Sequence, residues 1–120
     1  MSTRRKAGGA ARTSGTPPRY RVVWTRRAEV DLEDIGDYIA ADNPVAAERW
    51  VSKLMEQARK AADAPFGGRM VPEIRMESVR ETFLRTYRIV YRVLGDTVVI
   101  LTVFEGHRRL PRDLDVDDTP

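Results

Sequence analysis

The chain has 120 residues, which is enough for one domain and too few for a second core. It contains no cysteine and one histidine, which excludes a disulfide, a thiolate nucleophile and a zinc site built on cysteines or several histidines. No stretch reaches the roughly 18 uninterrupted apolar residues that a membrane-spanning helix needs. The sequence therefore predicts a globular, cytoplasmic protein without a membrane partner, and it indicates no cofactor.

The charge is unevenly distributed along the chain. The formal net charge is +3, yet residues 1–19 carry five basic residues and no acidic one, and residues 111–120 carry one arginine and four aspartates. Because residues 1–19 also lack an apolar period, they are predicted to form a disordered basic tail, either a nucleic-acid-binding arm or a passive extension. Residues 111–120 are predicted to be an acidic, frayed tail. The folded domain is then residues 20–110.

Hydrophobic spacing in the first half of this domain predicts a strand followed by two helices. Residues Tyr20–Trp24 are rich in aromatic and β-branched side chains, which is typical of a strand. Thr25 is a suitable N-cap for a helix of about sixteen residues, and Asn43 with Pro44 is a suitable start for a second helix. Both helices carry apolar residues at intervals of three and four, so we expect an antiparallel hairpin.

In the second half the apolar period changes to two. Residues 67–78 are predicted to be an irregular loop, and strands are predicted at Val79–Arg85, Tyr87–Val93 and Thr97–Phe104. Short links, with a turn at residues 94–96, should make these strands an antiparallel meander. Since neither the helices nor the sheet can bury an apolar face alone, the helix hairpin should cover one face of the sheet, giving an α+β domain.

No standard catalytic motif is present. The domain has no Gly-x-Ser-x-Gly turn and no phosphate-binding glycine loop, and the acidic residues of the first helix have the spacing of a solvated face. What remains is a cationic group from the three strands and the segment after them: Arg80, Arg85, Arg88, Arg92, Arg108, Arg109 and the lone His107. This group could hold phosphates, with His107 as general acid or base, or it could keep an exposed sheet face soluble.

Four large aromatic residues also permit two interpretations. Trp24, Tyr38, Trp50 and Phe83 are most simply core residues. Two helices cover only part of a sheet, however, so some of this apolar surface can remain open as a groove for a partner helix.

Six short segments of the chain, taken in their order along the sequence, carry a resemblance to a known family. They are Tyr20–Trp24 with Ala28–Leu32 and Ile35, Asp42–Arg49, Ala64–Arg69, Tyr87–Arg92, Val98–Phe104 and Glu105–Arg109. Together they resemble the RelE/ParE superfamily of toxins from bacterial toxin–antitoxin pairs, and the Asn43-Pro44 joint is more similar to the ParE branch. The resemblance implies the same strand–helix–helix–three-strand fold. It also implies a cognate ParD-like antitoxin that neutralises the chain by direct binding and through which alone operator DNA is contacted.

The resemblance further implies which residues bind. Antitoxins of this family lay an amphipathic helix into an apolar groove of the toxin. The groove residues expected here are Leu32, Ile35, Ile39, Trp50 and Leu54, with Arg85 and Arg88 available to acidic groups of the antitoxin. The expected contacts with the cellular target are Arg92, His107, Arg108 and Arg109.

Whether the chain is an enzyme depends on which branch of the superfamily, ParE or RelE, it belongs to. ParE-like toxins resemble binders that poison DNA gyrase without chemistry of their own, and this is the favoured interpretation. RelE-like toxins cut mRNA in the ribosome, and in that alternative Arg85, His107 and Arg109 would be catalytic. The chain has no lysine after Lys60 and no tyrosine after Tyr91, which departs from the RelE pattern. A third interpretation is a non-toxic member that acts only in an autoregulatory complex with its antitoxin.

Overall fold

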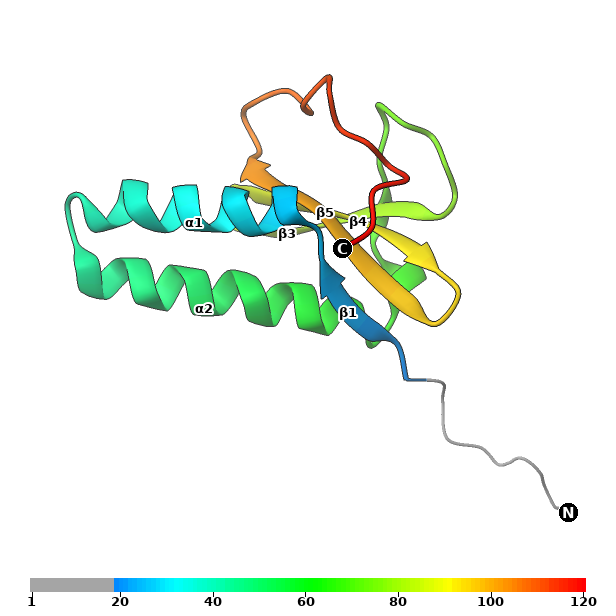
Figure 1. Ribbon diagram of the computed structural model, residues 1–120, viewed down its shortest axis with the longest axis horizontal. Coiled ribbons are helices and arrows are strands. Elements are labelled where there is room, and N and C mark those ends of the chain that lie inside the picture. Colours follow the sequence, from blue (N-terminus) through cyan, green and yellow to red (C-terminus); the bar gives the residue numbers. More distant parts are fainter. Residues whose placement is uncertain (1–18) are drawn as a thin grey trace, which may run out of the picture.

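The computed structural model describes residues 19–120 (Figure 1). Apart from Arg19, the basic tail predicted at residues 1–19 lies outside the described residues. The elements are β1 (Arg21–Trp24), α1 (Arg26–Ala40), α2 (Pro44–Ala61), the 3-10 helix η1 (Pro65–Gly67), β2 (Arg69–Met70), β3 (Val79–Leu84), β4 (Tyr87–Leu94) and β5 (Thr97–Glu105). The predicted order of a strand, two helices and three further strands is confirmed.

The strands form one five-stranded sheet in the order β1-β5-β4-β3-β2. β3, β4 and β5 are the predicted antiparallel meander, and the turn predicted at residues 94–96 is made by Gly95 and Asp96 between Leu94 and Thr97, which pair across it. Gly95 has a φ of +61°, a conformation that glycine adopts without strain. Two pairings were not predicted. β1 lies parallel to β5, and the loop at residues 67–78 contains the short β2, which pairs with β3.

Both helices begin at the predicted caps. The Ala28 amide donates a hydrogen bond to the Thr25 hydroxyl oxygen, and the Ala46 amide donates to the Asn43 side chain. The Thr25 hydroxyl also donates to the carbonyl of Ile100 at 2.9 Å, which fixes the start of α1 to the sheet. The two helices form an antiparallel hairpin whose closed end, at the left of Figure 1, extends beyond the sheet.

A first hydrophobic core lies between the hairpin and one face of the sheet, as predicted. Its buried members are Ala28, Leu54, Ala58, Ala61, Ile89, Tyr91, Val93, Val98, Ile100 and Val103. Small residues let the helices approach closely: a Cβ atom added at Gly36 would lie 3.1 Å from the Val51 side chain. Each apolar side chain of leucine size buried here stabilises the fold by about 1.5–3 kcal/mol.

A second core covers the opposite face of the sheet and was not predicted. Its buried members are Val71, Val79, Val90, Val99, Leu101 and Phe104. The residues that cover them come from the loop before β3 and from the C-terminal segment, where Leu110, Leu114 and Val116 pack onto the core. Residues 111–120 are therefore not frayed throughout, because Leu114 and Val116, which alternate with the aspartates, pack partly buried onto this core next to Leu110.

Ion pairs hold the C-terminal segment in place. Arg27 of α1 contacts Asp113 at 3.1 Å, and Arg92 of β4 contacts Asp117 and donates to the carbonyl of Val116. No helix within residues 19–120 is long and apolar enough to cross a membrane.

Candidate functional site

An open groove lies between α1 and the ends of β4 and β5. It has a volume of about 420 Å³ and is lined by Asp31, Asp34, Ile35, Tyr38, Tyr87, Val103, Phe104, Glu105 and Arg108. Tyr38 is 81% exposed, although its neighbour on the same side of α1, Ile35, packs partly against the first core. Because the helix hairpin extends beyond the sheet, the side of it that faces the sheet is left partly uncovered here. We call this surface the sheet-side groove.

An aromatic pair extends the sheet-side groove onto α2. The rings of Trp50 and Tyr87 lie 6.1 Å apart and are tilted by 57°, a favourable arrangement for aromatic rings. Lys53 lies 5.4 Å and Arg85 6.0 Å from the centre of the Trp50 ring, within the range of a cation–π interaction. On the α2 side the groove is therefore an aromatic surface bordered by cations, whereas the carboxylates of Asp31, Asp34 and Glu105 line its α1 and β5 side.

Arg85 owes its position to the turn between β3 and β4. Leu84 and Tyr87 pair directly, so Arg85 and Thr86 form a two-residue loop, and Arg85 has a φ of 54°. Few side chains adopt this left-handed conformation, which here turns the chain sharply beneath Trp50. Arg85 therefore lies beside Trp50 at the border of the sheet-side groove.

The other residues expected to line the antitoxin groove do not all lie on the same surface. Ile35 and Trp50 belong to the sheet-side surface, and Ile39 is half-buried on α1. Leu32 lines a different groove, on the outer side of the hairpin. The expectation that Leu54 lines the groove is wrong. Its side chain is fully buried in the first core, so it offers no surface to a partner.

The expectation that Arg88 is available to acidic groups of an antitoxin is also wrong. Its side chain is 9% exposed and lies on the sheet face opposite the helices, where it contacts Glu73 and Glu81 and lies over the Phe104 ring at 5.0 Å. Burial would lower the pKa of Arg88, but the hydrogen bonds to Glu73 and Glu81 override this and raise it. Arg88 is therefore not available to an antitoxin, because two carboxylates already neutralise it.

The partner of Arg88 was missed in the sequence. Glu81 is 1% exposed and sits between Arg69 and Arg88, accepting a hydrogen bond from each. A signal was present, because Glu81 occupies the same phase of the β3 alternation as the buried Val79. The hydrogen bond from Arg88 also lowers the pKa of the more exposed Glu73.

The expected target-binding residues do not come together. His107 is 81% exposed, and both its backbone amide and its ring Nδ1 lie within hydrogen-bond distance of Glu105 Oε1. The hydrogen bond from the His107 amide lowers the pKa of Glu105. Arg108 lines the sheet-side groove, whereas Arg109 lines a hollow on the opposite face beside Glu73 and Leu110.

Arg92, the remaining residue expected to contact the target, forms an ion pair with Asp117 of the C-terminal segment. For the alternative catalytic set, the Gly106 amide donates to the Thr86 carbonyl, which brings the segment of His107 next to the Arg85 turn. Arg109 does not share that position, since it faces the opposite hollow.

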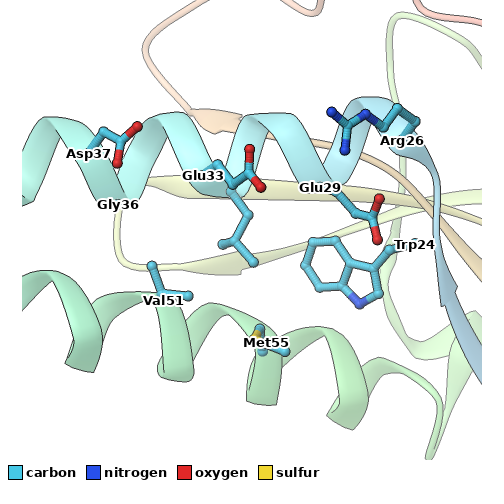
Figure 2. A pocket seen from close by; sticks show the side chains of 9 residues that line it. Trp24, Arg26, Glu29, Glu33, Gly36, Asp37, Val51 and Met55 are labelled. Atoms are coloured by element: carbon cyan, nitrogen blue, oxygen red, sulfur yellow. The ribbon is translucent and has the colours of Figure 1, made fainter.

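A further groove lies on the outer side of the helix hairpin, between α1 and α2 (Figure 2). We call it the outer groove. It has a volume of about 640 Å³ and is lined by Trp24, Arg26, Glu29, Leu32, Glu33, Gly36, Asp37, Val51 and Met55. Apart from Leu32, these residues are not part of the expected site. No group of three or more histidine, cysteine, aspartate or glutamate side chains within residues 19–120 is placed to hold a metal ion.

Comparisons with known proteins agree with the fold. The family model described as the ParE toxin of the type II toxin–antitoxin system parDE matches residues 22–110. The protein Y4kP of Sinorhizobium fredii is 40% identical over 98 residues, covering 80% of this chain and 98% of Y4kP. Toxin RelE2 of Caulobacter vibrioides is 36% identical over 88 residues, covering 73% of this chain and 97% of that toxin.

Solved structures of toxin–antitoxin systems are similar as well. One is the chromosomal ParDE system of P. aeruginosa, with a TM-score of 0.62 and 26% identity over 74% of this chain and 98% of that chain. Another is the toxin–antitoxin complex RelBE2 of Mycobacterium tuberculosis, with a TM-score of 0.55 and 26% identity over 72% of this chain and 98% of that chain. The resemblance to the RelE/ParE superfamily is confirmed, and the chain belongs to the ParE toxin family of type II toxin–antitoxin systems.

Proposed function

We propose that a ParD-like antitoxin neutralises this toxin by seating an amphipathic segment in the sheet-side groove. The observation that carries the proposal is the 81% exposure of Tyr38 beside Ile35 and the Trp50–Tyr87 pair. An aromatic surface left open on a small protein is typical of a binding site, and aromatic residues often dominate the energy of protein interfaces. Arg85 and Lys53 at its border suit acidic groups on the antitoxin. Operator DNA is then contacted only through the antitoxin.

We further propose that the free toxin poisons DNA gyrase. The match to the ParE family model favours the ParE branch of the superfamily, and the resemblance of that branch to gyrase poisons leads to this target. The arrangement of the cations is a second argument, because Arg109 faces a different hollow from Arg85 and His107, so the alternative catalytic set does not meet at one place. An mRNA-cleaving site needs a phosphate-binding group and an acid or base at one place.

A supercoiling assay tests this target. Purified toxin should inhibit gyrase and cause cleaved plasmid to accumulate, and the antitoxin added in equal amount should restore supercoiling. Gyrase that stays fully active at a large excess of toxin would refute the proposal.

The alternative target is the ribosome. It is favoured by the similarity to Toxin RelE2 and to the RelBE2 complex, and by the exposed His107 and Arg108 next to the sheet-side groove. In that case His107→Ala should abolish cleavage of mRNA during translation, whereas wild type that cuts no transcript ends this alternative. A third role, in an autoregulatory complex alone, predicts normal growth when the chain is expressed without its antitoxin.

A further inference from the structure

The outer groove of the helix hairpin carries a stripe of negative charge that the proposed function does not use. Glu29, Glu33 and Asp37 lie four residues apart on α1, and their carboxylates border the groove (Figure 2). Like charges at this spacing on a helix repel one another. None of the three forms an ion pair with a residue in the range 19–120, and the last turn of α1 contains no basic residue.

The floor of the same groove is apolar. Trp24 closes one end, and Val51 and Met55 of α2 face the acidic stripe across the groove (Figure 2). Met55 is 50% exposed. A second hollow, which shares Val51 and Asp37 with the first, continues toward the closed end of the hairpin and adds the carboxylate of Glu48. Arg26 also lines the groove, near Trp24, so its wall carries three carboxylates and one guanidinium and is net negative. A long groove with a net negative wall and an apolar floor suits a chain segment that carries several cations and small apolar residues.

The chain itself contains such a segment outside the described residues. We propose that the basic N-terminal residues 1–18 bind along the outer groove, with their cations against the carboxylates of α1. These residues include Arg4, Arg5, Lys6 and Arg12, no acidic residue, and several alanines and glycines. The charge of the segment and the charge of the groove are therefore complementary.

The N-terminal segment is long enough to extend along the whole outer groove. Arg19 lies two residues before β1, so the segment must return about 17 Å along the strand to Trp24 and then follow α1 for about 17 Å to Asp37. An extended chain spans about 3.3 Å per residue, which gives about 23 Å from Arg19 to Arg12 and about 43 Å from Arg19 to Lys6. Arg12 therefore reaches the Trp24 end of the groove, and Lys6 reaches Asp37.

The binding does not need high affinity. A segment joined covalently to the surface that it binds has an effective concentration in the millimolar range, so weak contacts suffice to populate the bound form. Several exposed ion pairs, each weak alone, act together along the stripe. The bound segment would cover Trp24 and Met55 and compete with any other basic segment for the groove.

Paramagnetic relaxation in the full-length chain tests this proposal. Because the sequence has no cysteine, Ala7→Cys provides a single attachment point for a nitroxide label. In a ¹⁵N-labelled sample made by cell-free synthesis, we expect the amide signals of residues 33–37 and 51–55 to lose at least half their intensity. The signals of Val71 and Val99, on the far face of the sheet, should keep theirs. The loss should disappear in about 0.5 M salt, where exposed charges are screened.

A charge-matched pair of variants supplies the control. Glu29→Gln/Glu33→Gln/Asp37→Asn should abolish the signal loss, whereas Asp34→Asn/Asp42→Asn/Glu77→Gln, which removes the same charge elsewhere, should preserve it. Absent or uniform broadening, broadening on another surface, or broadening that survives the first variant would overturn the proposal. So would signal loss that appears only when labelled and ¹⁵N chains are mixed, because the occupant would then be the segment of a second copy.

Discussion

Arg88 and Glu81 lie next to each other on neighbouring strands, and the Arg88 Nε donates a hydrogen bond of 2.9 Å to Glu81 Oε1 on the buried face of the sheet. The side chain of Glu81 is fully buried, and that of Arg88 is 9% exposed. Such a pair is costly to desolvate, so its two members depend strongly on each other. Several expectations about stability follow from this pair and from the two cores.

Arg88→Met should lower the free energy of unfolding by about 3–5 kcal/mol, because it leaves the carboxylate of Glu81 buried with only Arg69 as a partner. Urea denaturation followed by circular dichroism measures this change. Arg69→Met is the comparison variant: its side chain is 60% exposed and Glu81 keeps the buried Arg88 as a partner, so the loss of stability should be smaller than for Arg88→Met. The double variant Arg88→Met/Glu81→Met should recover much of the loss. A single and a double variant of equal stability would contradict the paired role.

Glu73 should make stability depend on pH. The hydrogen bond from Arg88 lowers the pKa of Glu73 in the folded chain. A carboxyl group whose folded pKa is lowered stabilises the fold above its unfolded value of about 4.3, and this contribution is lost as the pH falls through the folded pKa. Wild type should therefore be more stable than Glu73→Gln at pH 7, and the two should converge below about pH 4. Glu77→Gln, which changes an exposed carboxylate, should show no such difference; a gap between wild type and Glu73→Gln that persists at low pH would argue against the Arg88 contact.

Tyr38→Ala should weaken antitoxin binding at least tenfold while leaving stability within about 0.5 kcal/mol of wild type, because the ring is 81% exposed in the free toxin. Isothermal titration calorimetry with the purified antitoxin measures the affinity. Val45→Ala is the control, since Val45 is also exposed but lies outside the sheet-side groove. Unchanged affinity in Tyr38→Ala would move the antitoxin site away from this surface.

Leu54→Ala should lower the stability of the fold and not act through a lost contact with the antitoxin. Its side chain is fully buried between the helices and the sheet, so its removal should leave a cavity and cost about 2–5 kcal/mol. Thermal unfolding should show a clearly lower midpoint than for Met55→Ala, the exposed neighbour on α2. If a folded Leu54→Ala chain loses antitoxin affinity without losing stability, the side chain is a contact residue after all.

Leu114→Ser should destabilise the domain by about 1–3 kcal/mol, because Leu114 covers the second core together with Leu110 and Val116. Hydrogen exchange should show faster opening of the amides of Val99 and Leu101 beneath it. Arg112→Ser, at an exposed position of the same segment, should leave their exchange unchanged. Equal protection of these amides in both variants would mean that the C-terminal segment contributes no stability.

The fold was largely predictable because its signals are local. Thr25 and Asn43 act as caps through their own side chains, and the meander follows from alternation and short turns. The parallel pairing of β1 with β5 has no local signal, since it joins residues 76 positions apart, as in Arg21 with Thr97. The second core had no local signal for a similar reason. Part of its cover is Leu114 and Val116, which alternate with aspartates, and their burial depends on the sheet face that they meet.

The site was predicted less well than the fold. Ile35, Trp50 and Arg85 lie around one surface, but the sequence predicted cover on only one face of the sheet, whereas both faces are covered and Arg88 lies on the face of the second core. The covering depends on Glu73 and Glu81, which are 15 and 7 residues away in sequence. Charge pairs of this kind are set by tertiary contacts, so composition cannot reveal which arginine is neutralised.

The parallel pairing of β1 with β5 makes the folded sheet depend on nearly complete synthesis of the chain. The N-terminal strand leaves the ribosome early, yet its partner in the sheet is Thr97–Ile100, near the end of the chain. Contacts between such distant segments form slowly and late. A polypeptide released by premature termination before residue 97 therefore lacks β5, the strand with which both β1 and β4 pair. Such a fragment is not expected to complete the sheet or the grooves that lie against it.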